Sequence, residues 1–65
     1  MPIILAKITE GRTREKKQEL ARALTAETAR VLDIDPVKVR VLIEEYSPDL
    51  WTVGGVPLSE RNKKQ

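Results

Sequence analysis

The 65-residue chain contains no cysteine, no histidine and no phenylalanine, and its aromatic residues are one tryptophan and one tyrosine. These absences exclude disulfides, thiolate nucleophiles, cysteine–histidine zinc clusters and imidazole general bases. We therefore expect neither a metal nor a cofactor, and a reducing, cytoplasmic compartment fits the composition. No apolar run approaches the roughly 20 residues of a membrane-spanning helix, so no membrane partner is expected.

The chain also has little excess of either charge, because 12 Lys and Arg are nearly balanced by 10 Asp and Glu, which leaves a net charge of +2. The excess lies after Pro57, where Arg61, Lys63 and Lys64 outnumber Glu60. With no basic stripe elsewhere and no aromatic stacking platform, a nucleic-acid partner is not expected. The length predicts one domain over residues 1–58 and a polar, basic tail over 59–65. A chain this small with no disulfide or metal gains buried surface by association, so we expect an oligomer.

The segment 2–9 is typical of a β-strand. Its apolar residues lie on both alternating faces, with Ile4, Ala6 and Ile8 on one and Ile3 and Leu5 on the other. A strand that is apolar on both faces is covered on both faces. We expect the chain's own helix to cover one face and another subunit to cover the other.

The next segment favours a helix from an N-cap at Thr13 to about Leu32. Its stripe consists of Leu20, Leu24, Glu27/Thr28 and Val31, and Ala23 widens it. Pro36 ends the helix. Alternation then predicts a second strand from Val37 to Glu44, and residues 53–56 predict a short hairpin. Two strands joined by one helix form a right-handed βαβ unit with parallel strands. The predicted fold class is α/β: a single βαβ unit plus a short C-terminal hairpin.

Most candidate motifs have an ordinary structural interpretation. Asp33 and Asp35 flank the turn that ends the helix, which explains them better than a metal pair does. Glu44 and Glu45 are neighbours on a strand and therefore point to opposite faces. The glycines of the 53–56 segment precede no predicted helix, so a hairpin turn explains them better than a phosphate loop.

The remaining candidate base is Pro2. Removal of Met1 leaves a secondary amine at the start of an apolar strand, where desolvation and nearby cations lower the pKa of an amine. A neutral amine near pH 7 can abstract a proton without histidine. The alternative is a proline that merely begins an edge strand.

Three further residues fit a site with Pro2. Arg12 follows the glycine after the first strand, Arg40 interrupts an apolar strand, and Trp51 lies in a loop. Taken singly, each has an ordinary explanation. Arg12 would be a surface arginine, Arg40 an arginine paired with Glu44, and Trp51 a packing anchor. Because arginines bind carboxylates bidentately, the two together indicate a dianionic substrate.

The chain resembles the 4-oxalocrotonate tautomerase family over Pro2 to about Leu58. The resemblance is carried by Pro2, Glu10-Gly11-Arg12, Val39-Arg40-Val41 and Trp51-Thr52-Val53-Gly54-Gly55. It implies a βαβ tautomerase that assembles as a hexamer, a trimer of dimers, in aromatic degradation. Pro2 would be the general base that moves a proton in a 2-hydroxymuconate-like dicarboxylate.

The same resemblance assigns the other roles. Arg40, from a neighbouring subunit, would bind the carboxylate and carbonyl end and stabilise enolate charge; Arg12 would hold the distal carboxylate. Trp51 stands where the family usually has phenylalanine and would form the apolar wall. Val53 occupies the position of the glutamate in related dehalogenases, which argues against dehalogenation. The alternatives are a non-catalytic oligomeric binding or structural subunit, and one chain of a heteromeric tautomerase.

Overall fold

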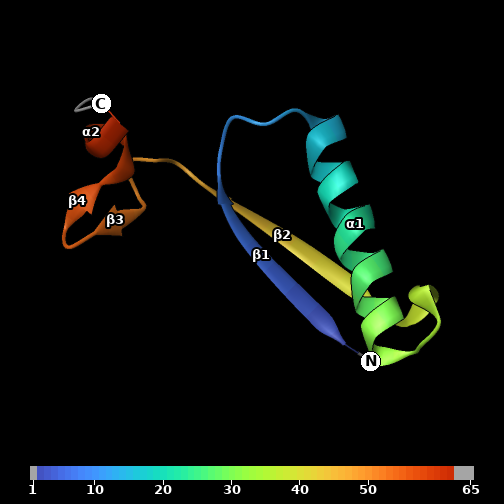
Figure 1. Cartoon of the computed structure of the whole chain (residues 1–65). Coiled ribbons are helices and arrows are strands. Elements are labelled where there is room, and N and C mark those ends of the chain that lie inside the picture. Colours follow the sequence, from blue (N-terminus) through green and yellow to red (C-terminus); the bar gives the residue numbers. More distant parts are fainter. Residues whose placement is uncertain (1, 63–65) are drawn as a thin grey trace.

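A computed structural model of the chain describes residues 2–62. Its elements, in chain order, are β1 (Ile3–Thr9), α1 (Arg14–Leu32), the 3₁₀ turn η1 (Pro36–Lys38), β2 (Arg40–Tyr46), β3 (Thr52–Val53), β4 (Val56–Pro57) and α2 (Leu58–Asn62) (Figure 1). β1 and β2 form one parallel sheet, and β3 and β4 form a separate antiparallel hairpin. The predicted α/β fold, a βαβ unit plus a C-terminal hairpin, is confirmed.

The parallel sheet has one covered face and one open face. Register places Ile3 opposite Arg40 and Leu5 opposite Leu42, so these four side chains share one face. The other face lies against α1, and its apolar side chains are half-buried: Ile4, Ala6, Ile8, Val41 and Ile43. On the open face Ile3 is 62% exposed and Leu42 54% exposed. The chain's own helix therefore covers one apolar face, as predicted, and a single chain leaves the second one bare.

Helix α1 begins and ends where the sequence predicts. The Thr13 hydroxyl accepts a hydrogen bond from the Lys16 N–H at 3.1 Å, and Asp33 ends the helix in the left-handed region with φ 57°. The predicted apolar stripe is only partly correct: Leu20 and Leu24 are half-buried, but Ala23 is exposed and Val31 is 62% exposed. A second row is covered as well: Ala21 and Thr25 are half-buried and Ala29 is buried. A straight helix crossing twisted strands makes contact along a row that drifts around its surface.

The second strand starts later than predicted. The Asp35 carboxylate accepts a hydrogen bond from the Val37 N–H at 3.0 Å, and this cap begins η1 with Pro36 in its first turn. Val37 and Lys38 therefore belong to the turn, and β2 starts at Arg40. The predicted strand start at Val37 is wrong because alternation over three residues does not distinguish a capped turn from a strand.

The C-terminal part contains the predicted hairpin and an additional helix. Gly54 and Gly55 have φ of 62° and 84°, the two positive values that a tight hairpin turn of the primed type requires. The sequence predicted no element after Leu58, but α2 occupies Leu58–Asn62. Residues 63–65 of the predicted tail lie outside the described residues.

A single chain has almost no core. Among the described residues with assigned burial, only Ala29 is buried, at 6% exposure. The radius of gyration is 14.9 Å, against about 11 Å for a compact domain of this length. The C-terminal hairpin and α2 extend beyond the end of the sheet (Figure 1). No helix within residues 2–62 is long and apolar enough to cross a membrane.

Candidate active site

Pro2 and Arg40 lie at the start of the two parallel strands. The Arg40 N–H donates a hydrogen bond to the Pro2 carbonyl at 3.1 Å, so the two backbones are adjacent. By the alternation of strand side chains, the two lie on opposite faces of the sheet. Arg40 pairs with Ile3 on the open face, whereas Pro2, two residues before Ile4, falls on the helix-covered face. Pro2 is half-buried and Arg40 is exposed. The structure thus brings the two residues together through the backbone and separates their side chains across the sheet.

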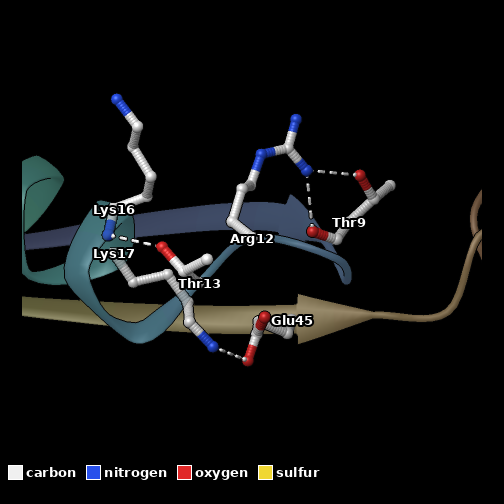
Figure 2. Close-up of polar contacts among 6 residues, drawn as sticks. All are labelled: Thr9, Arg12, Thr13, Lys16, Lys17 and Glu45. Atoms are coloured by element: carbon white, nitrogen blue, oxygen red, sulfur yellow. Dashed lines mark hydrogen bonds and ion pairs between the residues drawn. The ribbon is translucent and has the colours of Figure 1, made fainter.

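Arg12 lies beyond the other end of β1. Its Nη1 donates to both the carbonyl and the hydroxyl of Thr9, each at 3.0 Å (Figure 2). Gly11 has φ of 122°, a conformation that side chains rarely adopt, and this turn carries the chain from the strand toward α1. A cavity of about 240 Å³ lies here, lined by Ile8, Arg12, Lys16, Lys17 and Leu20. Arg12 is therefore a cation held by its own turn at the edge of a partly apolar hollow.

Lys17 lines the same cavity as Arg12, but its charged group is bound elsewhere. Its Nζ donates to Glu45 Oε1 at 3.1 Å and points away from Arg12, toward β2 (Figure 2). Lys16 extends on the same side of the ribbon as Arg12 (Figure 2). The two neighbouring lysines thus have different roles, and Lys17 ties α1 to the sheet.

Trp51 lies where the chain leaves the sheet for the hairpin. Its indole meets the Tyr46 ring edge-on, with ring centres 6.3 Å apart and planes at 88°. Its carbonyl accepts a hydrogen bond from the Leu58 N–H at 2.9 Å. A cavity of about 310 Å³ opens beside the indole, lined by Lys7, Tyr46, Leu50, Trp51 and Thr52. The cavity combines an aromatic wall with a single cation.

The four predicted site residues do not meet within one chain. Pro2 and Arg12 are separated by the length of β1, about 23 Å for seven residues. Figure 1 shows the start of β1 at one end of the sheet and the C-terminal hairpin beyond the other end. Bringing Pro2 together with Arg12 and Trp51 therefore requires more than one chain.

Sequence reasoning missed Lys7 and Tyr46, which line the cavity beside Trp51. The signal was present in the alternation, since Lys7, Glu44 and Tyr46 share the open-face phase. The Tyr46 hydroxyl donates to Glu44 Oε1 at 2.7 Å, and this hydrogen bond raises the pKa of Tyr46 above its ordinary value of 10.0. Tyr46 is therefore a neutral donor across the physiological range.

The ordinary interpretations of the acidic residues are confirmed. Asp33 caps α1 and Asp35 caps η1, so both serve the turn. Glu44 and Glu45 point to opposite faces, because one accepts from Tyr46 and the other from Lys17. Within residues 2–62 no group of three or more carboxylate, cysteine or histidine side chains is placed to hold a metal ion.

Comparison with known proteins identifies the family. A family model described as "Tautomerase enzyme" matches residues 2–61. A 2-hydroxymuconate tautomerase of Pseudomonas putida is 38% identical over 63 residues, which cover 97% of this chain and 100% of that protein. A probable tautomerase of Bacillus cereus is 38% identical over 61 residues, 94% of this chain and all of its own.

A solved structure agrees with these relatives. One chain of the heterohexamer 4-oxalocrotonate tautomerase of Chloroflexus aurantiacus J-10-fl superposes with a TM-score of 0.88 at 43% identity, covering 92% of this chain and 97% of that one. The family model, the sequence relatives and this fold all extend over nearly the whole chain. The chain is a member of the 4-oxalocrotonate tautomerase family of the tautomerase superfamily, and it is an isomerase that interconverts keto and enol groups.

Proposed function

We propose that this tautomerase moves a proton within a 2-hydroxymuconate-like unsaturated dicarboxylate, with the Pro2 amine as general base once Met1 is removed. The observation that carries the proposal is the distribution of Pro2, Arg12 and Arg40 over the two ends and two faces of one sheet. One base and two guanidinium groups suit a substrate with two carboxylates and one transferable proton. The similarity to the P. putida 2-hydroxymuconate tautomerase supports the same substrate class.

The proton transfer follows from the base. The Pro2 nitrogen takes the proton of the substrate's 2-hydroxyl group, and the electrons of that O–H bond form the carbonyl. The conjugated double bonds shift along the chain, and the same proton is returned to a carbon of the former diene. No oxidant, metal or cofactor is needed for this balance, since one O–H bond is exchanged for one C–H bond.

The other residues act around this transfer. Arg40 binds the carboxylate and carbonyl end, where negative charge develops on oxygen, and a guanidinium placed there stabilises the transition state more than the ground state. Arg12 holds the distal carboxylate, which does not change charge. Trp51 supplies an apolar wall, which favours the neutral form of the Pro2 amine.

Such a site requires assembly. We infer a hexamer, a trimer of dimers, in which each site combines Pro2 with residues of neighbouring subunits. The bare face that holds Ile3, Leu5 and Leu42 supports association. Of the related structures, the Chloroflexus protein is a heterohexamer, and this favours a second candidate in which a different chain completes the site.

The test is ultraviolet-monitored ketonisation of 2-hydroxymuconate by oligomeric protein whose intact mass shows that Met1 is absent. We expect the rate to rise with pH from about pH 5 to about pH 9 through an apparent pKa below that of a free proline amine. Protein that retains Met1 is the matched control, because its Pro2 nitrogen is an amide with no basicity. Equal rates for the two forms would disprove the role of Pro2. Activity that appears only after a second chain is added would identify the heteromeric form.

A further inference from the structure

The cavity beside Trp51 is built from three separate parts of the chain. Lys7 comes from β1, Tyr46 from the last position of β2, and Leu50, Trp51 and Thr52 from the segment that enters the hairpin. Trp51 and Tyr46 are half-buried, whereas Leu50 is 76% exposed. The half-buried indole therefore borders open space, and its orientation depends on the contacts that it makes.

Tyr46 is anchored on its own strand. Glu44 lies two residues earlier on the same face, and its Oε1 accepts the Tyr46 hydroxyl hydrogen at 2.7 Å. A hydrogen bond to a carboxylate is stronger than one between neutral groups. The bond fixes the far end of the phenol ring, while the strand fixes its Cβ.

Trp51 rests against this anchored ring. The planes of the two rings meet at 88°, the edge-to-face geometry that aromatic pairs prefer. The hydrogen bond from the Leu58 N–H holds the Trp51 backbone, but it does not restrict rotation of the indole about its own side-chain bonds. The edge-to-face contact with Tyr46 does restrict it.

We propose that Tyr46, anchored by Glu44, is a positioning residue for Trp51, and that this contact sets the width of the substrate pocket. The proposal rests on the proposed function, in which Trp51 forms the apolar wall of the site. A fixed indole leaves room for a flat, unbranched chain and obstructs a wider substituent. An indole that turns freely no longer discriminates between the two.

The experiment uses the Met1-free oligomer and exploits the composition of the chain, since Trp51 is its one tryptophan and Tyr46 its one tyrosine. The steady-state anisotropy of indole fluorescence then reports on a single residue. The variants are Tyr46→Ala, which removes the ring, Tyr46→Phe, which keeps the ring and loses the hydroxyl, and Glu44→Ala, which removes the acceptor. Glu45→Ala is the matched control, because it removes the adjacent carboxylate on the opposite face.

Activity is measured in parallel on 2-hydroxymuconate and on phenylenolpyruvate, an enol acid that carries a wide ring. For Tyr46→Ala we expect lower anisotropy and a preference for the narrow substrate reduced by about five- to tenfold in the ratio of kcat/KM values. Tyr46→Phe and Glu44→Ala should give smaller changes in the same direction. Glu45→Ala, which instead removes the ion pair with Lys17, should leave the anisotropy and the ratio of kcat/KM values as in the wild type.

Each outcome decides the proposal. Unchanged anisotropy in Tyr46→Ala overturns the positioning role, and lower anisotropy with an unchanged substrate ratio overturns the link to pocket width. An equal loss of activity on both substrates, with unchanged anisotropy, marks a merely structural residue. If the wild type converts neither substrate, the proposed function fails, but the anisotropies of the four variants still decide whether Tyr46 orients Trp51.

Discussion

The two ends of the parallel sheet differ in what they hold together. At the start of the strands, a backbone hydrogen bond joins Pro2, the proposed base, to Arg40. At the other end, side chains predominate: Arg12 binds Thr9, and Tyr46 binds Glu44 and meets Trp51. Neither end is a complete site. Under the proposed function, the two ends are partial sites that assembly joins.

The largest effect should come from Pro2, on which the first partial site depends. In the Met1-free oligomer, Pro2→Ala replaces a secondary amine by a primary amine of different basicity and geometry. We expect kcat/KM for 2-hydroxymuconate to fall by about 10²- to 10⁴-fold, the usual contribution of a general base. Circular dichroism and size-exclusion chromatography check that fold and assembly are intact. Full activity in a folded Pro2→Ala oligomer would contradict the assignment.

Mixing subunits tests directly whether the two partial sites come from different chains. If each site combines two chains, Pro2→Ala protein and Arg12→Ala protein, unfolded together and reassembled, form some sites that take Pro2 from one copy and Arg12 from another. Random assembly in equal amounts restores about a quarter of wild-type activity at low substrate concentration. Each variant reassembled alone is the control. No recovery would indicate that both residues of a site belong to one chain.

Substitutions of the two arginines should change different kinetic constants. Arg40→Ala removes a contact that strengthens as charge develops, so kcat falls together with kcat/KM. Arg12→Ala removes a contact that is equal in the ground and transition states, so KM rises with kcat little changed. Each loss is expected to be about 10- to 100-fold, the range for one charged hydrogen-bonded contact. Initial rates over a range of 2-hydroxymuconate concentrations distinguish the two patterns, and the reverse result would exchange the roles.

The bare face of the sheet should respond to charge. Leu42→Asp places a carboxylate where burial of a leucine contributes about 1.5–3 kcal/mol per subunit. We expect a shift toward smaller species in sedimentation velocity, with loss of activity in proportion. Gln18→Asp, which adds the same charge on the exposed side of α1, serves as the control. An intact Leu42→Asp oligomer would show that this face is not the interface.

The smallest effect concerns the ionisation of Tyr46. The hydrogen bond to Glu44 raises the pKa of Tyr46 above 10.0, so the stability it contributes is present below that pH and is lost as the pH rises through the higher folded-state value. An ultraviolet absorbance titration of the single tyrosine should therefore give a midpoint above 10.0. Glu44→Gln, which removes the charge and keeps an acceptor, should lower that midpoint. An unchanged midpoint would mean that Glu44 does not hold the phenol.

Much of the fold could be predicted because local chemistry determines it. The Thr13 cap, the end of α1 before Pro36, the two glycines of the hairpin and the opposite directions of Glu44 and Glu45 each depend on a few adjacent residues. Errors arose where several patterns fit equally well. Val37 continues the alternation of the strand but is held in a capped turn. Val31 continues the stripe of the helix but lies outside the row of α1 residues that the sheet covers.

Candidate site residues could be selected from the sequence, but their arrangement could not. Pro2, Arg12, Arg40 and Trp51 could be selected because amines, guanidinium groups and indole have distinctive chemistry. Their distribution over two ends and two faces follows from register, which the sequence alone does not specify. Tyr46 escaped notice because its importance comes from a contact with Trp51 across the turn after β2.

The near absence of buried side chains in the single chain has a thermodynamic consequence. Since several large apolar side chains of the single chain are exposed, we expect folding and assembly to form one equilibrium, whose midpoint depends on protein concentration. Dilution of the oligomer should lower its melting temperature and its specific activity in parallel. For this chain, we expect both stability and activity to depend on the concentration of the protein.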